Sequence, residues 1–202
     1  MEKEREMKVG IFVFDDVEEL DFVGPWEVFT SAKMAKPDLE VFLFSDQKES
    51  ITCAKGMKIV VDQTFDEVKD LDVLLVPGGA GNRRDLANDA LLQKIKAIAD
   101  DCQWVTSVCT GAFILLAAGL LEGKKCTTHW RFLDKLEEFA GESQVISDVR
   151  FVRDGQTVTA AGVSAGIDMA LWLVGQWYDP KTARLVQKGI QYDPAPPYQA
   201  II

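Results

Sequence analysis

The sequence predicts an α/β fold: a single domain, residues 1–202, with a doubly wound, mostly parallel sheet and a cysteine at a sharp turn after one strand. Two observations predict this fold. Several short runs of apolar, often β-branched residues lack polar alternation, which is typical of buried parallel strands. These runs alternate with segments of helical length and pattern. The 202 residues are 48% hydrophobic, enough for one full core, and we find neither a linker nor an internal repeat.

In the first half of the chain, strands are expected where apolar residues follow one another, and Gly or Pro marks the turns between them. Pro25 suits the first turn of a helix over residues 23–36, and Gly56 suits the turn of a hairpin. The expected strands are residues 8–14, 39–45 and 71–76, the hairpin joins residues 51–53 to 58–61, and an amphipathic helix covers residues 89–101.

In the second half, a strand over residues 104–108 leads directly into a helix pattern of small and apolar residues, 111–119. Asp154-Gly155 suits the tight turn of a second hairpin. Residues 164–177 are mostly apolar, so their helix should be buried. The remaining expected elements are a short helix over 130–139, hairpin strands over 149–152 and 157–160, and a last helix over 180–191.

The composition narrows the classes of function. The net charge is −10 and no basic cluster exceeds two residues, so nothing in the sequence supports binding to nucleic acid. Residues 1–6, which we expect to be disordered, contain no signal-peptide core, and no apolar run is long enough to span a bilayer. The four cysteines form no CxxC pair and there is one histidine, which argues against a metal site and favours a reducing, cytoplasmic location.

Cys109 is the strongest candidate for chemistry. It follows an apolar, β-branched run and precedes a helix pattern that begins at Gly111, so we expect it at a strand–turn–helix bend. Such a bend lifts the side chain off the sheet, as in the G-x-S-x-G elbow of hydrolases, although Ser107 replaces the first glycine. The helix N-terminus should favour the nucleophilic thiolate. The alternative is a buried core cysteine.

Asp21 follows the first strand, between the apolar residues Leu20 and Phe22. A carboxyl group in an apolar crevice beside a thiolate should have a raised pKa, and it could deliver a proton to a substrate. The alternative is a cap for the helix that follows. The acidic neighbours Glu18 and Glu19 are expected to be solvated loop charges.

Residues 77–81 form a glycine-rich loop after a predicted strand. The N–H groups of Gly78 and Gly79, with that of Thr110, could form an oxyanion hole; the alternative is an ordinary tight loop. The Thr110 hydroxyl could hold a carboxylate or a water molecule, or it could cap the helix.

His129 is the single histidine, twenty residues after Cys109. It could pair with the cysteine, or it could be a packing residue, because the sequence does not give the distance between them. The carboxyl ends of parallel strands meet at one sheet edge. We therefore expect the loops 15–24, 77–81 and 109–111 to converge on one crevice.

Together these residues resemble the ThiJ/PfpI (DJ) superfamily over nearly the whole chain. The resemblance implies a flavodoxin-like sheet of the kind found in class I glutamine amidotransferases. It rests on residues 20–25, 76–79, 107–111 and 161–168. Within the superfamily the chain is most similar to the isocyanide hydratases, at residues 105–111, 117–121, 127–130 and 192–197.

The resemblance implies an enzyme that hydrates a small-molecule isocyanide, R–NC, to an N-substituted formamide without a cofactor, and that forms a homodimer. Carried over, Cys109 is the nucleophile, Asp21 the acid/base carboxylate and Thr110 its hydroxyl partner. The residues expected to bind substrate or an oxyanion are Gly78, Gly79, Thr110, Trp26 and His129.

Two departures from this pattern concern the substrate pocket. Trp26 stands where a smaller polar or imidazole side chain is expected, and residues 161–166 begin Ala-Gly rather than Gly-Gly. Two other functions therefore stay open: a glyoxalase-type dicarbonyl hydratase, and a non-catalytic ligand or oxidation sensor related to AraC-type regulators. Thr110 replaces the histidine expected after the nucleophile in the PfpI protease branch, which argues against peptidase activity.

Overall fold

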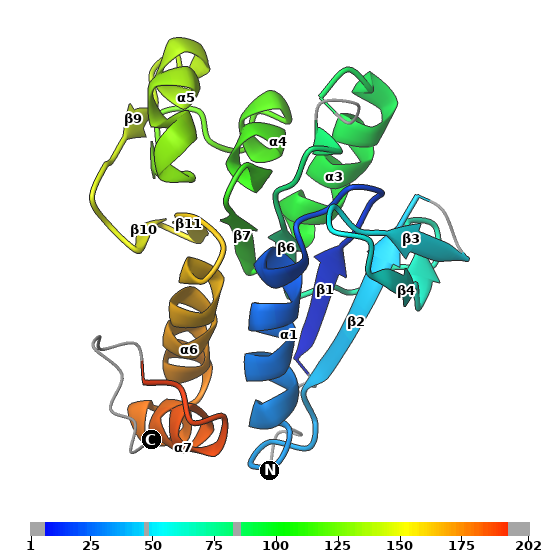
Figure 1. Ribbon diagram of the computed structural model, residues 1–202, viewed down its shortest axis with the longest axis vertical. Coiled ribbons are helices and arrows are strands. Elements are labelled where there is room, and N and C mark those ends of the chain that lie inside the picture. Colours follow the sequence, from blue (N-terminus) through cyan, green and yellow to red (C-terminus); the bar gives the residue numbers. More distant parts are fainter. Residues whose placement is uncertain (1–6, 47–48, 83–85, 194–202) are drawn as a thin grey trace.

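Figure 1 shows the computed structural model, which describes residues 7–46, 49–82 and 86–193. At its centre is a seven-stranded sheet in the order β10-β11-β7-β6-β1-β2-β5. Its neighbouring strands are parallel except β10 and β11, so the predicted mostly parallel α/β fold is confirmed. The strands are β1 (Lys8–Phe12), β2 (Glu40–Ser45), β5 (Gln63–Thr64), β6 (Val73–Val76), β7 (Trp104–Val108), β10 (Phe151–Asp154) and β11 (Thr157–Ala160). The expected disorder of residues 1–6 lies outside the described residues.

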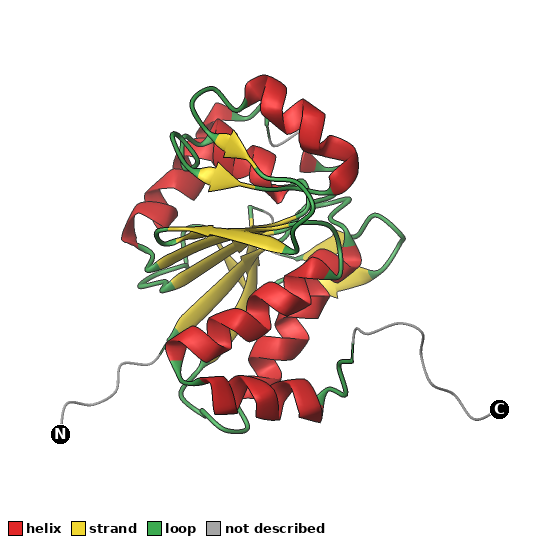
Figure 2. Ribbon diagram, turned by 90° about the vertical axis from the view of Figure 1, so that its left-hand side faces the viewer, coloured by secondary structure: helices red, strands yellow, loops and turns green. Residues whose placement is uncertain are grey.

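Helices cover both faces of this sheet (Figures 1 and 2). On one face α1, α6 and α7 pack against one another, and on the other face lie α3, α4 and α5. None of the helices in the described part of the chain is long and apolar enough to cross a membrane. Their bounds are α1 (Glu19–Ala32), α3 (Asp89–Asp101), α4 (Gly111–Ala117), α5 (Leu133–Phe139), α6 (Ala165–Trp177) and α7 (Pro180–Gly189), with a 3-10 turn η1 (Trp130–Phe132) before α5.

The central strands are buried because helices cover them from both sides. Every residue of β6 is buried, and so is every residue of β1 after Lys8. The rings of Phe12, Phe44 and Phe65 lie 5.1–5.7 Å apart between centroids and fill the core beside β2. This burial on both faces explains why the strands lack the polar alternation of a half-exposed sheet.

A small hairpin of β3 (Ser50–Thr52) and β4 (Lys58–Val60) lies beside the main sheet, as predicted. Three two-residue strands were not predicted, because two residues are too few to establish a hydrophobic period. One is β5 at the edge of the main sheet. The others are β8 (Lys125–Cys126) and β9 (Gln144–Val145), which pair with each other.

The bounds of α1 differ from the prediction in a way that matters for function. The helix begins at Glu19, four residues before the predicted start, and it ends at Ala32 rather than at residue 36. Pro25 therefore lies inside the helix instead of in its first turn. The sequence was misread because Pro is most common in the first turn of a helix. As a result Asp21 belongs to the first turn of α1 and not to the loop before it.

Candidate active site

Three segments meet at the carboxyl ends of β1, β6 and β7, as predicted for a parallel sheet. The N–H of Glu18 donates to the carbonyl of Gly78 (2.9 Å), and the N–H of Gly79 donates to the hydroxyl oxygen of Thr110 (3.0 Å). Gly79 also forms an antiparallel bridge with Val17. The loop after β6 is thus held between the start of α1 and the turn after β7.

Cys109 occupies that turn with a left-handed backbone conformation, φ = 56°. Few residues other than glycine adopt a positive φ, and such strain is concentrated at functional sites. The N–H of Cys109 is shared between the carbonyls of Ala160 (3.1 Å) and Ala161 (2.7 Å), and its carbonyl accepts from the Thr128 hydroxyl (2.7 Å). These bonds fix the backbone of the predicted elbow, and Cys109 is only 7% exposed.

Asp21 is fully buried in the first turn of α1. Its Oδ2 accepts a hydrogen bond of 2.8 Å from the N–H of Gly78. Its Oδ1 is buried without a partner in ordinary hydrogen-bond geometry, yet the Cys109 thiol lies close enough for each group to alter the pKa of the other. The residue before the helix is Glu18, so the capping role considered for Asp21 is wrong.

The hydroxyl oxygen of Thr110 accepts two hydrogen bonds, from the Gly79 N–H and from the side-chain amide of Asn82 (3.1 Å). An oxygen with both lone pairs engaged still has its own proton to donate. The N–H and the hydroxyl of Thr110 both act to lower the pKa of Cys109, so both lie where they can donate to the sulfur. Thr110 precedes α4, but its side chain makes no capping bond.

The loop glycines hold the acidic and hydroxyl side chains in place. The Gly78 and Gly79 N–H groups donate to Asp21 and Thr110, and their expected part in an oxyanion hole stays a prediction. A Cβ at position 78 would lie 2.6 Å from both the nitrogen and Oγ1 of Thr110, and 2.8 Å from Oδ2 of Asp21. Only glycine fits between these two residues.

Burial dominates the electrostatics of the site. It raises the pKa of Asp21 to about 7, against the opposing hydrogen bond from Gly78, and the charge of Glu18 raises this pKa further. Burial and then the charge of Asp21 raise the pKa of the Cys109 thiol to about 12. The raised Asp21 pKa was predicted. The prediction that the helix N-terminus would favour a thiolate is wrong, because desolvation outweighs the donors of Thr110.

His129 lies beside this site without a hydrogen bond to Cys109 in the described part of the chain. Its ring covers Gly162, where a Cβ would come within 2.2 Å of the imidazole, and its Nδ1 accepts from the N–H of Arg131 (3.2 Å). Burial and the charge of Arg131 lower its pKa, whereas the charge of Glu18 raises it. His129 therefore faces the acidic start of α1 as a neutral ring near pH 7.

Trp26 is not brought to the cysteine by any contact we find within residues 7–46, 49–82 and 86–193. It lies on α1 five residues after Asp21, about 140° around the helix, and packs partly buried against the hydrophobic core. Its role in shaping the substrate pocket stays a prediction.

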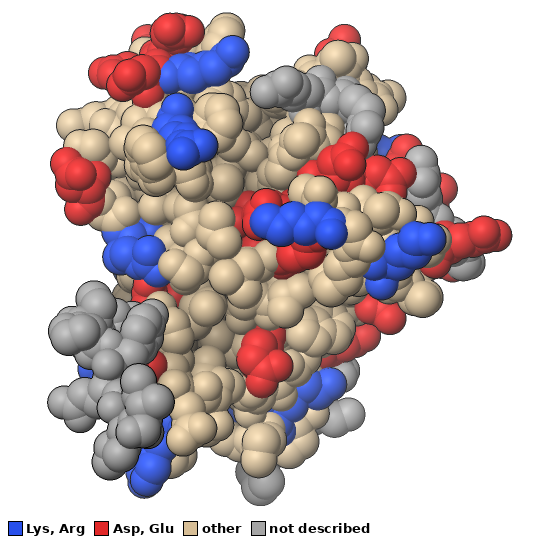
Figure 3. Space-filling model, in the orientation of Figure 1, with Lys and Arg blue, Asp and Glu red and all other residues tan. Residues whose placement is uncertain are grey.

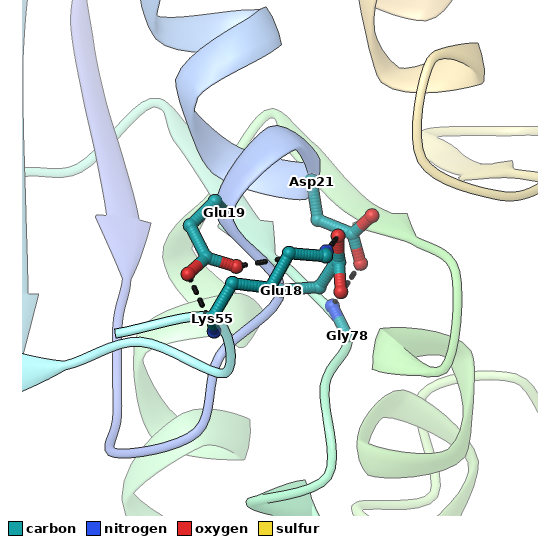
Figure 4. A network of polar contacts seen from close by, with 5 residues as sticks. All are labelled: Glu18, Glu19, Asp21, Lys55 and Gly78. Atoms are coloured by element: carbon teal, nitrogen blue, oxygen red, sulfur yellow. Dashed lines mark hydrogen bonds and ion pairs between the residues drawn. The ribbon is translucent and has the colours of Figure 1, made fainter. Parts of the chain in front are cut away.

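Three polar residues at the site were missed by the sequence analysis. Asn82 is 3% exposed and orients the Thr110 hydroxyl, and the only sequence signal for it was its place directly after the glycine loop. Glu18 and Glu19 were expected to be solvated, but both contact Lys55 of the β3–β4 turn (Figure 4). Among the described residues we find no group of three or more His, Cys, Asp and Glu side chains that could hold a metal ion.

Comparison with known proteins identifies the family of the chain. The model of the DJ-1/PfpI family matches residues 7–176 of the chain. The chain belongs to the DJ-1/PfpI family. An isonitrile hydratase of Pseudomonas putida is 39% identical over 194 residues, which cover 96% of this chain and 82% of that protein.

Solved structures of DJ-1/PfpI proteins have the same fold. A ThiJ/PfpI family protein of Pseudomonas syringae superposes with a TM-score of 0.86 at 33% identity, over 99% of this chain and 82% of the other. DJ-1beta of Drosophila melanogaster superposes with a TM-score of 0.80 over 93% and 99% of the two chains. At 18% identity, the likeness to the fly protein concerns the fold alone.

Proposed function

We propose that this protein hydrates isocyanides (isonitriles) to N-substituted formamides. The observation that carries the proposal is the position of the Cys109 thiol beside the buried Asp21 carboxyl and the donors of Thr110. These groups lie in a chain that is homologous over nearly its full length to an isonitrile hydratase. The reaction needs a nucleophile and a proton carrier at one carbon atom, and this site places one of each together.

The first step forms a covalent intermediate. Asp21 takes the proton of the Cys109 thiol, the sulfur bonds to the terminal carbon of R–NC, and Asp21 delivers the proton to that same carbon. The product is a thioimidate, Cys109–S–CH=N–R, and the step consumes no oxidant or reductant. Because the thiol pKa is raised, the thiolate exists only as this transfer occurs, stabilised by the Thr110 donors.

The second step releases the product. Water adds to the thioimidate carbon and gives a proton to Asp21, which passes one to the substrate nitrogen. The C–S bond then breaks, the formamide R–NH–CHO leaves, and the sulfur recovers its proton. The first step requires that Asp21 and Cys109 together hold one proton, on the thiol, and the second step begins with Asp21 ionised and Cys109 bonded to the substrate carbon. The pH dependence of the first step therefore belongs to the pair rather than to either residue.

The test is formamide production from an aryl isocyanide by the wild-type protein and by Cys109→Ala. We expect formamide from the wild type alone, and an adduct of the isocyanide mass on the Cys109 peptide after acid quenching. Equal formamide from both proteins would overturn the proposal. Faster turnover of methylglyoxal than of any isocyanide would replace it with the dicarbonyl hydratase, and ligand binding without turnover of either would favour the sensor.

The expected setting of this activity is a homodimer in a reducing cytoplasm, acting on a small molecule without a cofactor. The four cysteines, all free and buried, support the reducing location. On the face drawn in Figure 3, Lys and Arg are scattered among acidic side chains rather than gathered into a basic surface. With the net charge of −10, this supports the expectation that the protein does not bind nucleic acid.

A further inference from the structure

The turn between β3 and β4 lies directly over the segment that leads into α1. The N–H of Asp16 donates to the carbonyl of Thr52 (2.8 Å), and the N–H of Ala54 donates to the carbonyl of Val17 (2.9 Å). The N–H of Lys55 donates to Oε1 of Glu19 (2.6 Å). These backbone bonds place the Lys55 side chain over the start of α1, although the two segments are more than thirty residues apart in sequence.

Lys55 meets a concentration of negative charge there. Glu18, Glu19 and Asp21 lie within four consecutive positions. The ammonium group of Lys55 pairs with Glu18 and lies 3.8 Å from Oε2 of Glu19, and Figure 4 shows it between these carboxylates, with Asp21 and Gly78 beside them. The hydrogen bond to Glu18 and the charges of all three acids raise the pKa of Lys55, so it stays cationic.

We propose that Lys55 is a positioning residue for Asp21: by pairing with Glu18 and Glu19 it offsets the negative charge beside the buried carboxyl and lets Asp21 serve as a base at neutral pH. The inference deepens the proposed hydratase function and rests on it. Burial raises the pKa of Asp21, the Gly78 N–H opposes that rise, and the charges nearby shift this pKa further. Among the described residues, Lys55 is the cation that we find in contact with Glu18 and Glu19, and it comes from an element outside the main sheet.

The charged groups around Asp21 come from three directions. Glu18, the residue directly before α1, raises the pKa of Asp21, whereas Lys55, from the hairpin, lowers it. Cys109 faces it from the turn after β7 as a thiol. His129 is within electrostatic reach of Glu18 from the segment before η1, but its pKa is lowered, so it contributes no charge near pH 7. Removing Lys55 therefore takes the Lys55 ammonium away from Glu18, which stays beside Asp21.

The first test compares Lys55→Gln with Lys55→Arg and with Lys58→Gln. Lys58 is an exposed lysine of the same hairpin, and in the described part of the chain we find no contact from it to Glu18 or Glu19. Each variant keeps the backbone bonds of the turn. We expect Lys55→Gln to move the acidic limb of the activity profile up by about 0.3–1 pH unit, a loss of about two- to tenfold at pH 6 and none at pH 9. Lys55→Arg and Lys58→Gln should retain the wild-type profile.

A second readout does not depend on hydratase turnover. The rate of alkylation of Cys109 by iodoacetamide, followed by peptide mass, should rise through the same first pKa of the Asp21–Cys109 pair. The shift in Lys55→Gln should appear there too, and it should shrink in 1 M KCl because Lys55 is largely exposed. If the wild type makes no formamide, the proposed function fails while this profile still tests Lys55.

Variants of Glu18 test whether Lys55 acts on Asp21 through Glu18. Glu18→Gln should move the acidic limb to lower pH, and adding Lys55→Gln to that variant should shift the limb by less than in the wild type. An unchanged alkylation profile in Lys55→Gln would overturn the inference. So would an equal loss of rate at all pH values together with a lowered melting temperature, because that result would mark Lys55 as a merely structural residue.

Discussion

Asp21 offers the sharpest test of this site, because its replacement should remove activity and raise stability at once. Asp21→Asn keeps the shape and an acceptor for the Gly78 N–H, but it cannot carry a proton. General acid–base catalysis typically accelerates a reaction about 10²–10⁴-fold, so kcat/KM should fall by that factor. This loss corresponds to ~3–5 kcal/mol in activation free energy. The assay is formamide formation from an aryl isocyanide at pH 8, where wild-type Asp21 is ionised.

The effect on stability follows from the raised pKa. In the unfolded chain Asp21 ionises near 3.8, but in the folded protein it keeps its proton until about pH 7. The neutral carboxyl therefore contributes fully to the free energy of unfolding below pH 3.8. This contribution, at most ~4 kcal/mol, is lost as the pH rises to about 7. Asparagine does not ionise, so this loss is absent from the variant.

We therefore expect Asp21→Asn to be more stable than the wild type. The difference in free energy of unfolding between the two proteins should be about 2–3 kcal/mol larger at pH 8 than at pH 5. Urea denaturation at the two pH values measures the difference, and Asp66→Asn, at an exposed position, is the control for the loss of a surface carboxylate. A stability change independent of pH would show that the Asp21 pKa is not raised. Activity within tenfold of the wild type would remove Asp21 as the proton carrier.

Four further outcomes are expected. Thr110→Val removes the acceptor of the Asn82 amide and the Gly79 N–H, so urea denaturation should show a loss of about 1–3 kcal/mol and kcat/KM a loss of at least about tenfold. Gly78→Ala pushes Thr110 and Asp21 apart and should cost on the order of 100-fold in kcat/KM, with substrate still bound. His129→Gln should stay within about tenfold of wild-type activity, a change of at most ~1.4 kcal/mol in activation free energy. An inactive His129→Gln together with an active Asp21→Asn would establish a Cys–His dyad instead. Light scattering at micromolar concentration should give the mass of a dimer, and a monomer would contradict that expectation.

The sequence predicted the parts of the site that follow from local pattern. The run before Cys109 and the small residues after it predicted the elbow, and the positive φ at Cys109 confirms it. The convergence of three loops followed from the parallel sheet alone, since parallel strands end at one edge. The start of α1 was missed because Pro25 suits a first turn, whereas here the helix continues through it.

The charge state of the cysteine could not be predicted in the same way. A helix N-terminus is visible in a sequence, and it favours a thiolate. Burial is not visible, and at Cys109 burial and the Asp21 charge raise the thiol pKa by more than the Thr110 donors lower it. The partners of the Gly78 and Gly79 N–H groups were hidden for a related reason: a sequence does not show which side chains reach a backbone N–H, and here Asp21 and Thr110 do so.

The raised thiol pKa changes what the neighbouring carboxyl must do. A cysteine that is already a thiolate needs only an acid beside it, but a buried thiol needs a base that is ionised before substrate arrives. Asp21 can be that base only because its pKa is near 7 and not higher, and the Gly78 N–H and the Lys55 cation both act to keep it there. In this proposal the Cys109 thiol, in the turn after β7, depends on a lysine of the β3–β4 hairpin outside the main sheet, a dependence that only the folded chain reveals.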